Sequence, residues 1–90
     1  MSNLRSFVTP AFRKLYSELP VPVQELARQK YLLFKADPNH PSLAFQQKGH
    51  VWTVAIGRSY RAIARRREDA LYWVWIGRHE EYNRLLQRMK

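Results

Sequence analysis

The first third of the chain carries apolar residues at helical spacing. Thr9 followed by Pro10 is typical of a helix start, because a threonine side chain can accept from the first free amides and proline fits the first helical position. Apolar and aromatic residues then recur three and four positions apart, which predicts a helix over residues 10–19. A second helix is expected over residues 22–35, before the stop at Asp37-Pro38. The short connection makes the pair an antiparallel helical hairpin.

After residue 42 the pattern changes to short runs that are rich in branched and aromatic side chains. Strands are expected at residues 43–47, 51–56, 60–66 and 70–76. Three residues separate each strand from the next, and connections this short join antiparallel neighbours. Residues 3–8 are a candidate for an additional edge strand.

Alternation along the middle strands predicts a sheet with two different faces. One face receives the apolar side chains of Trp52, Val54, Ile56, Tyr60, Ala62 and Ala64. Arg61, Ile63 and Arg65 point to the other face. We therefore expect the helices to cover the first face, and a basic surface to form on the second.

The last strand differs because apolar residues lie on both of its faces. Strict alternation puts Trp73 and Trp75 on one face and Tyr72, Val74 and Ile76 on the other. A strand of this kind is expected in the interior of the sheet, where at most one face can meet a ligand.

Gly77 ends the last strand, and a final helix is expected after it. Glu80 and Glu81 would lie in its first turn, where negative charge complements the helix dipole. Its apolar stripe consists of Tyr82, Leu85, Leu86 and Met89. The sequence thus predicts one α+β domain over residues 1–90, with an N-terminal helical hairpin packed on a twisted antiparallel sheet of about four strands and a short C-terminal helix.

The charge of the chain narrows the classes of partner. Sixteen Lys and Arg against seven Asp and Glu give a formal net charge of +9, which attracts phosphate polymers, anionic membranes or acidic proteins. The absence of cysteine excludes disulfides, thiolate catalysis and zinc or iron–sulfur sites built on cysteine. No apolar run is long enough for a signal peptide or a membrane span, so a cytoplasmic location without a membrane partner is expected.

Residues 58–67 concentrate the charge, with five arginines and no acidic residue. Arginine binds phosphate oxygens bidentately, so this run is a candidate nucleic-acid track. The alternative is a solvated strand whose charge discourages aggregation through the sheet edge.

Histidine supplies the other candidate chemistry. His40, His50 and His79 have no partner at metal-ligand spacing, so neither a metal site nor a cofactor is expected. His79 follows the strand-to-helix junction and Tyr82 lies one turn later on the same helical face. The histidine could exchange a proton and the tyrosine could hydrogen-bond a phosphate. The alternative is structural, with His79 as a helix cap and Tyr82 in the core.

Several short motifs follow one another along nearly the whole chain. They are Thr9-Pro10-x-Phe12, Leu19-Pro20, Asp37-Pro38-x-His40-Pro41-Ser42-Leu43-x-Phe45, Trp52-x-Val54-x-Ile56-Gly57, Tyr60-Arg61-Ala62 and Trp73-x-Trp75-Ile76-Gly77-x-His79-x-x-Tyr82. In this order and spacing they resemble the RelE/ParE superfamily of toxins from bacterial type II toxin–antitoxin systems. The resemblance implies a RelE-like fold, in agreement with the expected elements, and a cognate antitoxin that wraps the toxin and neutralises it.

For the RelE-like branch, the resemblance implies a metal-independent endoribonuclease. Such a toxin cleaves messenger RNA on the ribosome by driving a ribose 2′-hydroxyl onto the adjacent phosphate, and so inhibits translation and growth. Arg61 would then bind the phosphate, His79 would act as the acid or base, and Tyr82 would orient the substrate.

The chain departs from the family pattern at three positions that are often basic, where it has Ala44, Gln46 and Ala55. The remaining candidates for contact with RNA phosphate are Lys48, Arg58, Arg65 and Arg78. Two alternatives therefore stay open. The ParE-like branch shares the fold and inhibits DNA gyrase by protein contact, and the missing cations also suit a catalytically weakened RelE-fold binding protein.

Overall fold

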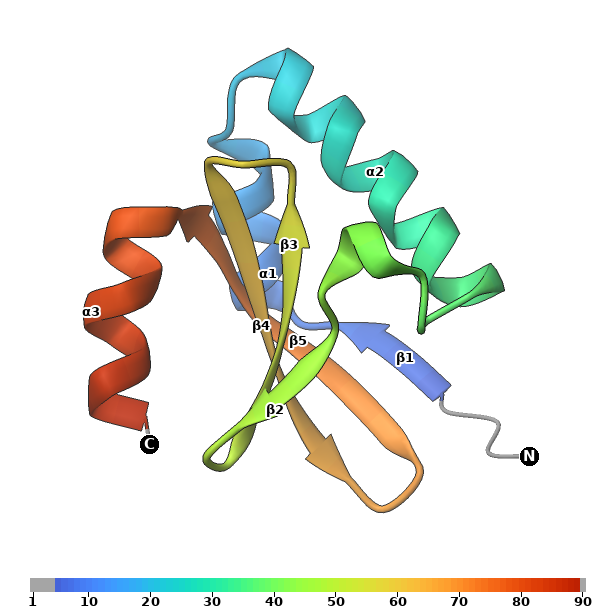
Figure 1. The fold of residues 1–90 in the computed structure, drawn as a ribbon. Helices are drawn as coiled ribbons and strands as arrows, with labels where there is room; N and C mark the ends of the chain where they lie inside the picture. The colour runs from blue at the N-terminus through green and yellow to red at the C-terminus, as the bar shows by residue number, and fades with distance from the viewer. Residues whose placement is uncertain (1–4, 90) are drawn as a thin grey trace.

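The helices and strands follow the expected order, with one additional strand at the N-terminus (Figure 1). The structure, a computed structural model, describes residues 5–89. Its elements are β1 (Arg5–Val8), α1 (Pro10–Ser17), α2 (Val21–Ala36), a 3₁₀ turn (Pro41–Leu43), β2 (Gln46–Lys48), β3 (Val51–Ile56), β4 (Tyr60–Arg67), β5 (Ala70–Arg78) and α3 (His79–Met89). The predicted α+β class is confirmed.

The strands form one sheet in the order β1-β5-β4-β3-β2. Strands β2 to β5 are antiparallel neighbours, as expected. The edge strand predicted over residues 3–8 is present as Arg5–Val8, and Asn3 and Leu4 lie outside the described residues. Because β1 runs parallel to β5, the sheet is mixed rather than purely antiparallel. This pairing also places β5 inside the sheet, as its two apolar faces predict.

The two N-terminal helices form at the predicted positions with small shifts. Thr9 caps α1, and its Oγ1 accepts from the Phe12 amide at 3.2 Å. The helix ends at Ser17 rather than at residue 19, since Pro20 disfavours helical backbone at the residue before it. The Gln24 side chain of α2 then donates to carbonyl oxygens at the end of α1, at 3.1–3.3 Å, and so joins the two helices.

The strand expected at residues 43–47 is displaced, because β2 spans Gln46–Lys48. The preceding 3₁₀ turn buries Leu43 completely in the core. Ala44 then adopts a φ of 46°, a left-handed conformation that a strand does not allow. Burial of one leucine thus outweighs the local preference for strand, and Lys48 lies in a strand rather than in a turn.

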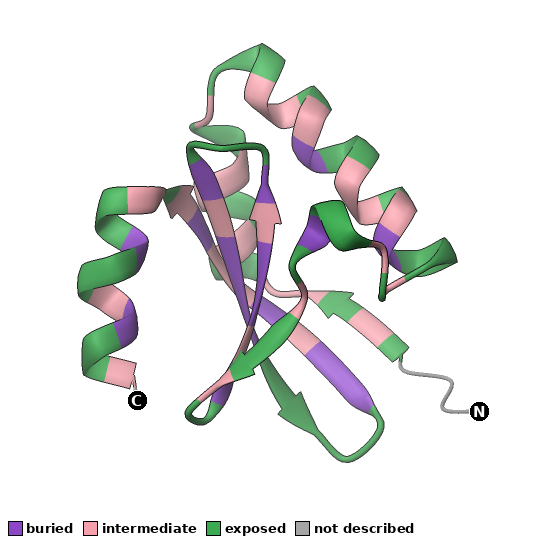
Figure 2. Ribbon diagram, viewed as in Figure 1, coloured by how far each residue is buried: buried purple, intermediate pink, exposed green. Residues whose placement is uncertain are grey.

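Different helices cover the two faces of the sheet. On the first face Val54, Ala62 and Leu71 form the main core with residues of α1 and α2. On the second face α3 packs over Val51 and Ile63. Figure 2 shows the buried residues running along the centre of β3, β4 and β5. The predicted assignment of β3 and β4 residues to the two faces is confirmed.

The prediction of a basic surface on the second face of the sheet is wrong in one respect. Arg61 and Arg65 do lie on the second face, but Ile63 between them is 0% exposed in the cluster beneath α3. The helix therefore interrupts the arginine track that the sequence predicts. An apolar stripe on a helix needs an apolar surface to cover, and Ile63 supplies part of that surface.

A β-bulge changes the faces within β5. Ile63 pairs with Trp75, but the next residue, Ala64, pairs with Trp73, so Val74 is the extra residue. A bulge of this kind breaks the alternation of side chains. Trp73 consequently packs beneath the N-terminal helices and Trp75 beneath α3. The prediction that both tryptophans share one face is wrong for this reason.

Candidate functional site

The junction between β5 and α3 brings His79 and Tyr82 together. The helix begins at His79, directly after the strand, and the His79 amide donates to the Ser59 carbonyl at 2.8 Å. The imidazole is half-buried, with its ring centroid 6.2 Å from that of Tyr82. Asn83 Nδ2 lies 3.4 Å from His79 Nδ1. When this amide donates, a neutral imidazole carries its proton on Nε2 and can donate there.

Tyr82 is a core residue that links α3 to β2. Its side chain is 3% exposed and belongs to the cluster beneath α3. Lys48 of β2 places its Nζ 5.5 Å from the centroid of the tyrosine ring, within the range of cation–π attraction. The ring thus lies close to both a histidine and a lysine. This burial fits a residue that holds the site in place, and its contact with substrate stays a prediction.

Arg61 lies on the same face, near the end of the sheet where α3 begins. Its register partners are Ala55 on β3 and Gly77 on β5. Its Nη1 donates to three carbonyl oxygens in and beside the β3–β4 turn at 2.7–3.4 Å. Part of the guanidinium therefore stabilises this turn. Gly77 is a glycine for a steric reason, since a Cβ there would lie 2.6 Å from the Trp75 indole.

The other predicted phosphate ligands are spread around the sheet. Arg58 is exposed in the β3–β4 turn, one residue before Ser59. Arg78 lies over the ring of Tyr60, 5.7 Å from its centroid, and Tyr60 belongs to the core beneath α1 and α2. Arg65 is exposed on the second face, beyond the part that α3 covers. Arg65 is thus distant from the β5–α3 junction. Arg78 is at the junction, but its side chain lies with Tyr60 on the first face of the sheet, opposite to Arg61.

Neutral residues occupy positions on this face where the resemblance leads us to expect cations. Ala55 lies directly opposite Arg61 in the ladder. Gln46 pairs with Thr53, two residues before Ala55 and therefore on the same face. Ala44 is exposed just before β2. A cation at 55 would stand beside Arg61, and one at 46 would lie two strands away on the same side of the sheet. The face therefore has fewer positive charges than the net charge of the chain implies.

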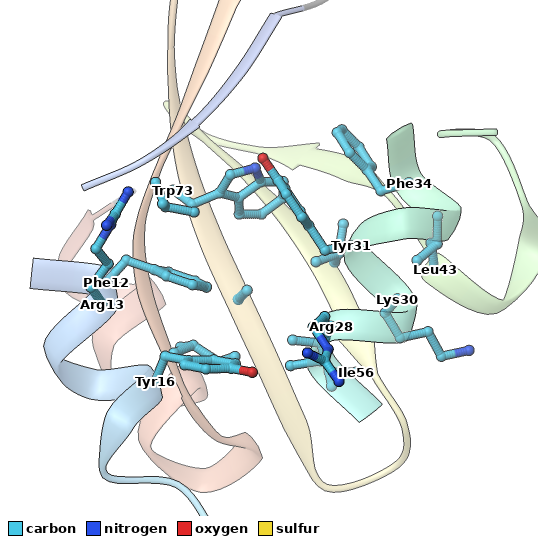
Figure 3. Close-up of a pocket in the computed structure, with 15 residues that line it drawn as sticks. Phe12, Arg13, Tyr16, Arg28, Lys30, Tyr31, Phe34, Leu43, Ile56 and Trp73 are labelled. Atoms are coloured by element: carbon cyan, nitrogen blue, oxygen red, sulfur yellow. The ribbon is translucent and has the colours of Figure 1, made fainter. Parts of the chain in front are cut away.

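An apolar groove that the sequence reasoning missed lies between the N-terminal helices and the sheet (Figure 3). It forms a cavity of about 330 Å³. Phe12 and Tyr16 of α1 line one side, and Tyr31 of α2 lines the other. Ile56 and Trp73 of the sheet form part of its floor.

The groove exists because the two helices are only loosely packed on the sheet. None of the residues of α1 is buried, and in α2 only Ala27 and Phe34 are buried. Cationic side chains stand at its rim, where Arg13 and Arg28 are exposed. The signal in the sequence is the set of aromatic residues on the inner sides of the two helices, Phe12, Tyr16 and Tyr31, which are only half-buried. An apolar floor with a cationic rim suits an acidic segment with apolar side chains.

Among residues 5–89, the structure holds no group of three or more His, Asp or Glu that could bind a metal ion. Each helix in this part of the chain is too short or too polar to cross a membrane.

Solved structures of toxins share this fold. A free arginine-to-alanine double mutant of the toxin RelE from E. coli is 13% identical, with a TM-score of 0.63 over 98% of this chain and 99% of that chain. The RelE of an archaeal RelE–RelB complex from Pyrococcus horikoshii OT3 is 14% identical, with a TM-score of 0.60 over 84% and 94%. A copper-bound point mutant of a toxin from Helicobacter pylori is 20% identical, with a TM-score of 0.58 over 87% and 97%.

These likenesses establish the RelE-like fold, and a family model adds evidence from sequence. No curated protein is similar enough in sequence to count as a match. The model of the ParE-like toxin domain, however, matches residues 22–84, from the start of α2 into α3. Because this match covers well over half of the chain, the protein belongs to the ParE-like toxin domain family and is a toxin of the RelE/ParE superfamily, from a toxin–antitoxin system.

Proposed function

We propose that this toxin is an endoribonuclease that cleaves messenger RNA on the ribosome without a metal ion, and so stops translation and growth. One observation supports this most. His79 and Lys48 both lie close to the Tyr82 ring, at 6.2 Å and 5.5 Å, on the face of the sheet that carries Arg61. A group that can transfer a proton thus lies near cations that can hold a phosphate.

The proposed reaction needs a base, an acid and positive charge. The ribose 2′-oxygen forms a bond to the adjacent phosphorus, and the bond from phosphorus to the 5′-oxygen of the next nucleotide breaks. The base takes the 2′-hydroxyl proton, and the acid protonates the leaving oxygen. His79 performs one of these two transfers. Lys48 and Arg61 stabilise the charge that develops on the phosphate, and Tyr82 acts as a positioning residue for His79 and Lys48.

Mapping of transcript 5′ ends after induced expression tests this proposal. The wild-type toxin should create new 5′ ends in translated messages, and His79→Ala should reduce them at least roughly 100-fold, the usual scale of general acid–base catalysis. His50→Ala is the matched control, because His50 is an exposed histidine in the β2–β3 turn. Unchanged cleavage by a folded His79→Ala variant would contradict the catalytic role of His79.

Inhibition of DNA gyrase is a second candidate, and one observation favours it. Neutral Ala55 faces Arg61, and Nη1 of Arg61 is engaged by the β3–β4 turn. A toxin that acts by protein contact needs no complete phosphate site. This alternative predicts loss of gyrase supercoiling by the purified toxin, with transcripts left intact. Full supercoiling at toxin concentrations that stop growth would reject it.

We propose that the apolar groove receives a segment of the cognate antitoxin. The cationic rim predicts acidic residues beside the apolar side chains of that segment. Arg28→Glu reverses one charge at the rim and should weaken the toxin–antitoxin complex in a calorimetric titration. Lys14→Glu makes the same charge change on the exposed side of α1 and serves as the control. Equal affinity for both variants would show that the antitoxin binds elsewhere.

A further inference from the structure

A group of exposed arginines lies with two aromatic side chains, the exposed Phe7 and the half-buried Tyr72, on the second face of the sheet, at the end away from His79. Phe7, Tyr72 and Arg65 form one row across β1, β5 and β4. In the next row Arg5 and Arg67 flank Ala70, which is 4% exposed. Partners in a ladder and residues two apart share a face, so these side chains stand together. We call Arg5, Phe7, Arg65, Arg67 and Tyr72 the aromatic–arginine platform.

The aromatic side chains of the platform are stacked on the surface rather than packed in the core. The rings of Phe7 and Tyr72 have centroids 5.3 Å apart and an interplanar angle of 21°. Phe7 is 38% exposed, and the Arg5 guanidinium lies 5.2 Å from its ring centroid. Phe7 and Tyr72 are members of neither core cluster. Both rings thus lie outside the core clusters of the described residues, Phe7 exposed and Tyr72 half-buried, in adjacent strands at this edge.

We infer that the aromatic–arginine platform binds single-stranded RNA. An unpaired base can stack on an exposed aromatic ring, because every base has a flat π-face, and arginines beside the ring can hold the flanking phosphates. The Arg5 guanidinium lies over the Phe7 ring, within the range of cation–π attraction, and stands close enough to hold a phosphate beside a base stacked there. Arg65 and Arg67, both exposed on β4, supply the phosphate contacts on the Tyr72 side.

Two acidic residues limit the strength of this site. Glu68 and Asp69 of the β4–β5 turn line the hollow that also contains Arg5, Arg67 and Tyr72. Their charges oppose the approach of phosphate and confine the favourable potential to the side of Arg65. Removal of one of these charges should therefore tighten binding of RNA. If the carboxylate instead held the arginines in place, its removal should weaken binding.

The platform is separate from the candidate catalytic site. Tyr72 and His79 are seven residues apart along β5 and its junction with α3, roughly 20 Å at the rise of a strand. The cluster beneath α3 occupies the face between them. Binding at the platform thus needs no catalysis, although the choice of RNA over DNA rests on the proposed function. A message held at both places would have to pass around α3, which covers the face between them.

The test measures fluorescence anisotropy of a labelled 2′-O-methyl oligouridylate of about eight nucleotides, which cannot be cleaved by attack of a 2′-hydroxyl. The triple variant Arg5→Ala/Arg65→Ala/Arg67→Ala should bind at least 10-fold more weakly. The slope of the logarithm of its binding constant against the logarithm of the salt concentration should become shallower by about two units, since each phosphate contact contributes about 0.7. Phe7→Leu should weaken binding about 5-fold or more at unchanged slope. Asp69→Asn should bind more tightly than the wild type.

A matched control separates the platform from general charge. Lys14→Ala/Lys35→Ala/Arg88→Ala also removes three exposed cations, from the helices, and should retain affinity within about 2-fold, while circular dichroism confirms that every variant is folded. Equal weakening by both triple variants, or wild-type affinity in the platform variant, would overturn the inference. Equal affinity for a labelled DNA oligonucleotide of the same length, measured in the same way, would overturn the assignment to RNA. Because the probe is not cleaved, failure of the ribonuclease proposal does not change these outcomes.

Discussion

Replacement of Gly77 by alanine tests the packing beside the candidate catalytic site. Gly77 is the β5 partner of Arg61 and stands two residues before His79. A Cβ at this position would lie 2.6 Å and 2.8 Å from two ring carbons of Trp75. These separations are too short for carbon atoms, so the indole must move. It is packed beneath α3, and its movement should therefore disturb the helix that carries His79.

Two opposing contributions determine the size of the effect. Overpacking in a structured region costs about 1–3 kcal/mol. Alanine also restricts the unfolded chain more than glycine does. This restriction stabilises the folded state by about 0.4–1 kcal/mol where the folded backbone can accept alanine. Gly77 lies within β5, where alanine is allowed. The clash should prevail, with a net loss of roughly 1–2 kcal/mol in the free energy of unfolding. For a domain of this size, that corresponds to a Tm lower by about 4–16 °C.

Thermal and urea unfolding followed by circular dichroism measure this loss. The matched background is Trp75→Leu, in which the indole is absent. There Gly77→Ala should be neutral or stabilising, and the difference between the two backgrounds gives the coupling between the residues. A wild-type Tm for Gly77→Ala would refute the reasoning, as would an equal loss in both backgrounds.

Other substitutions test separate parts of the structure. Ile63→Ala should lower the unfolding free energy by about 2–5 kcal/mol and Ile63→Val by only about 0.5–1.5 kcal/mol, since this residue is 0% exposed beneath α3; equal urea midpoints would show that α3 does not depend on it. Glu68→Gly should raise the stability by roughly 1 kcal/mol, because Glu68 has a φ of 55°, and an unchanged or lower Tm would contradict this. Thr9→Ala removes the cap of α1 and a bond to the Trp73 carbonyl at 2.8 Å, and should cost about 1–2 kcal/mol in urea unfolding. Tyr82→Phe keeps the ring beside His79 and Lys48, so RNA cleavage should be little changed; loss of cleavage in a folded variant would assign the hydroxyl to substrate.

The sequence predicts more of the fold than of the candidate site. The predicted helices and the strands β3 to β5 lie within a few residues of those observed, because amphipathic spacing reports directly on which side of an element is buried. The candidate site depends on contacts between distant segments. Lys48 of β2 meets Tyr82 of α3, and β2 is shifted to Gln46–Lys48 from the predicted residues 43–47. Nothing local to residues 43–48 indicates that shift.

The arginines also show which features the sequence reveals and which only the structure reveals. The five arginines of residues 58–67 are visible in the sequence, but their use differs from one to the next. Arg61 stabilises the β3–β4 turn, Arg66 lies 5.8 Å from the Trp52 ring on the first face, and Arg65 and Arg67 join the exposed platform. Alternation could assign the faces. It could not show that α3 would cover the middle of one face, since that depends on where the chain returns after β5.

Local patterning by itself determined the α+β class, the order of the elements and the faces of β3 and β4, because each follows from the period of burial within one segment. Only the tertiary structure decided the bulge at Val74, the separation of Arg61 from Arg65 and the groove beside Phe12. These features arise where two or more elements compete to cover the same apolar surface. The outcome depends on volumes and distances across the fold, which no single stretch of sequence contains.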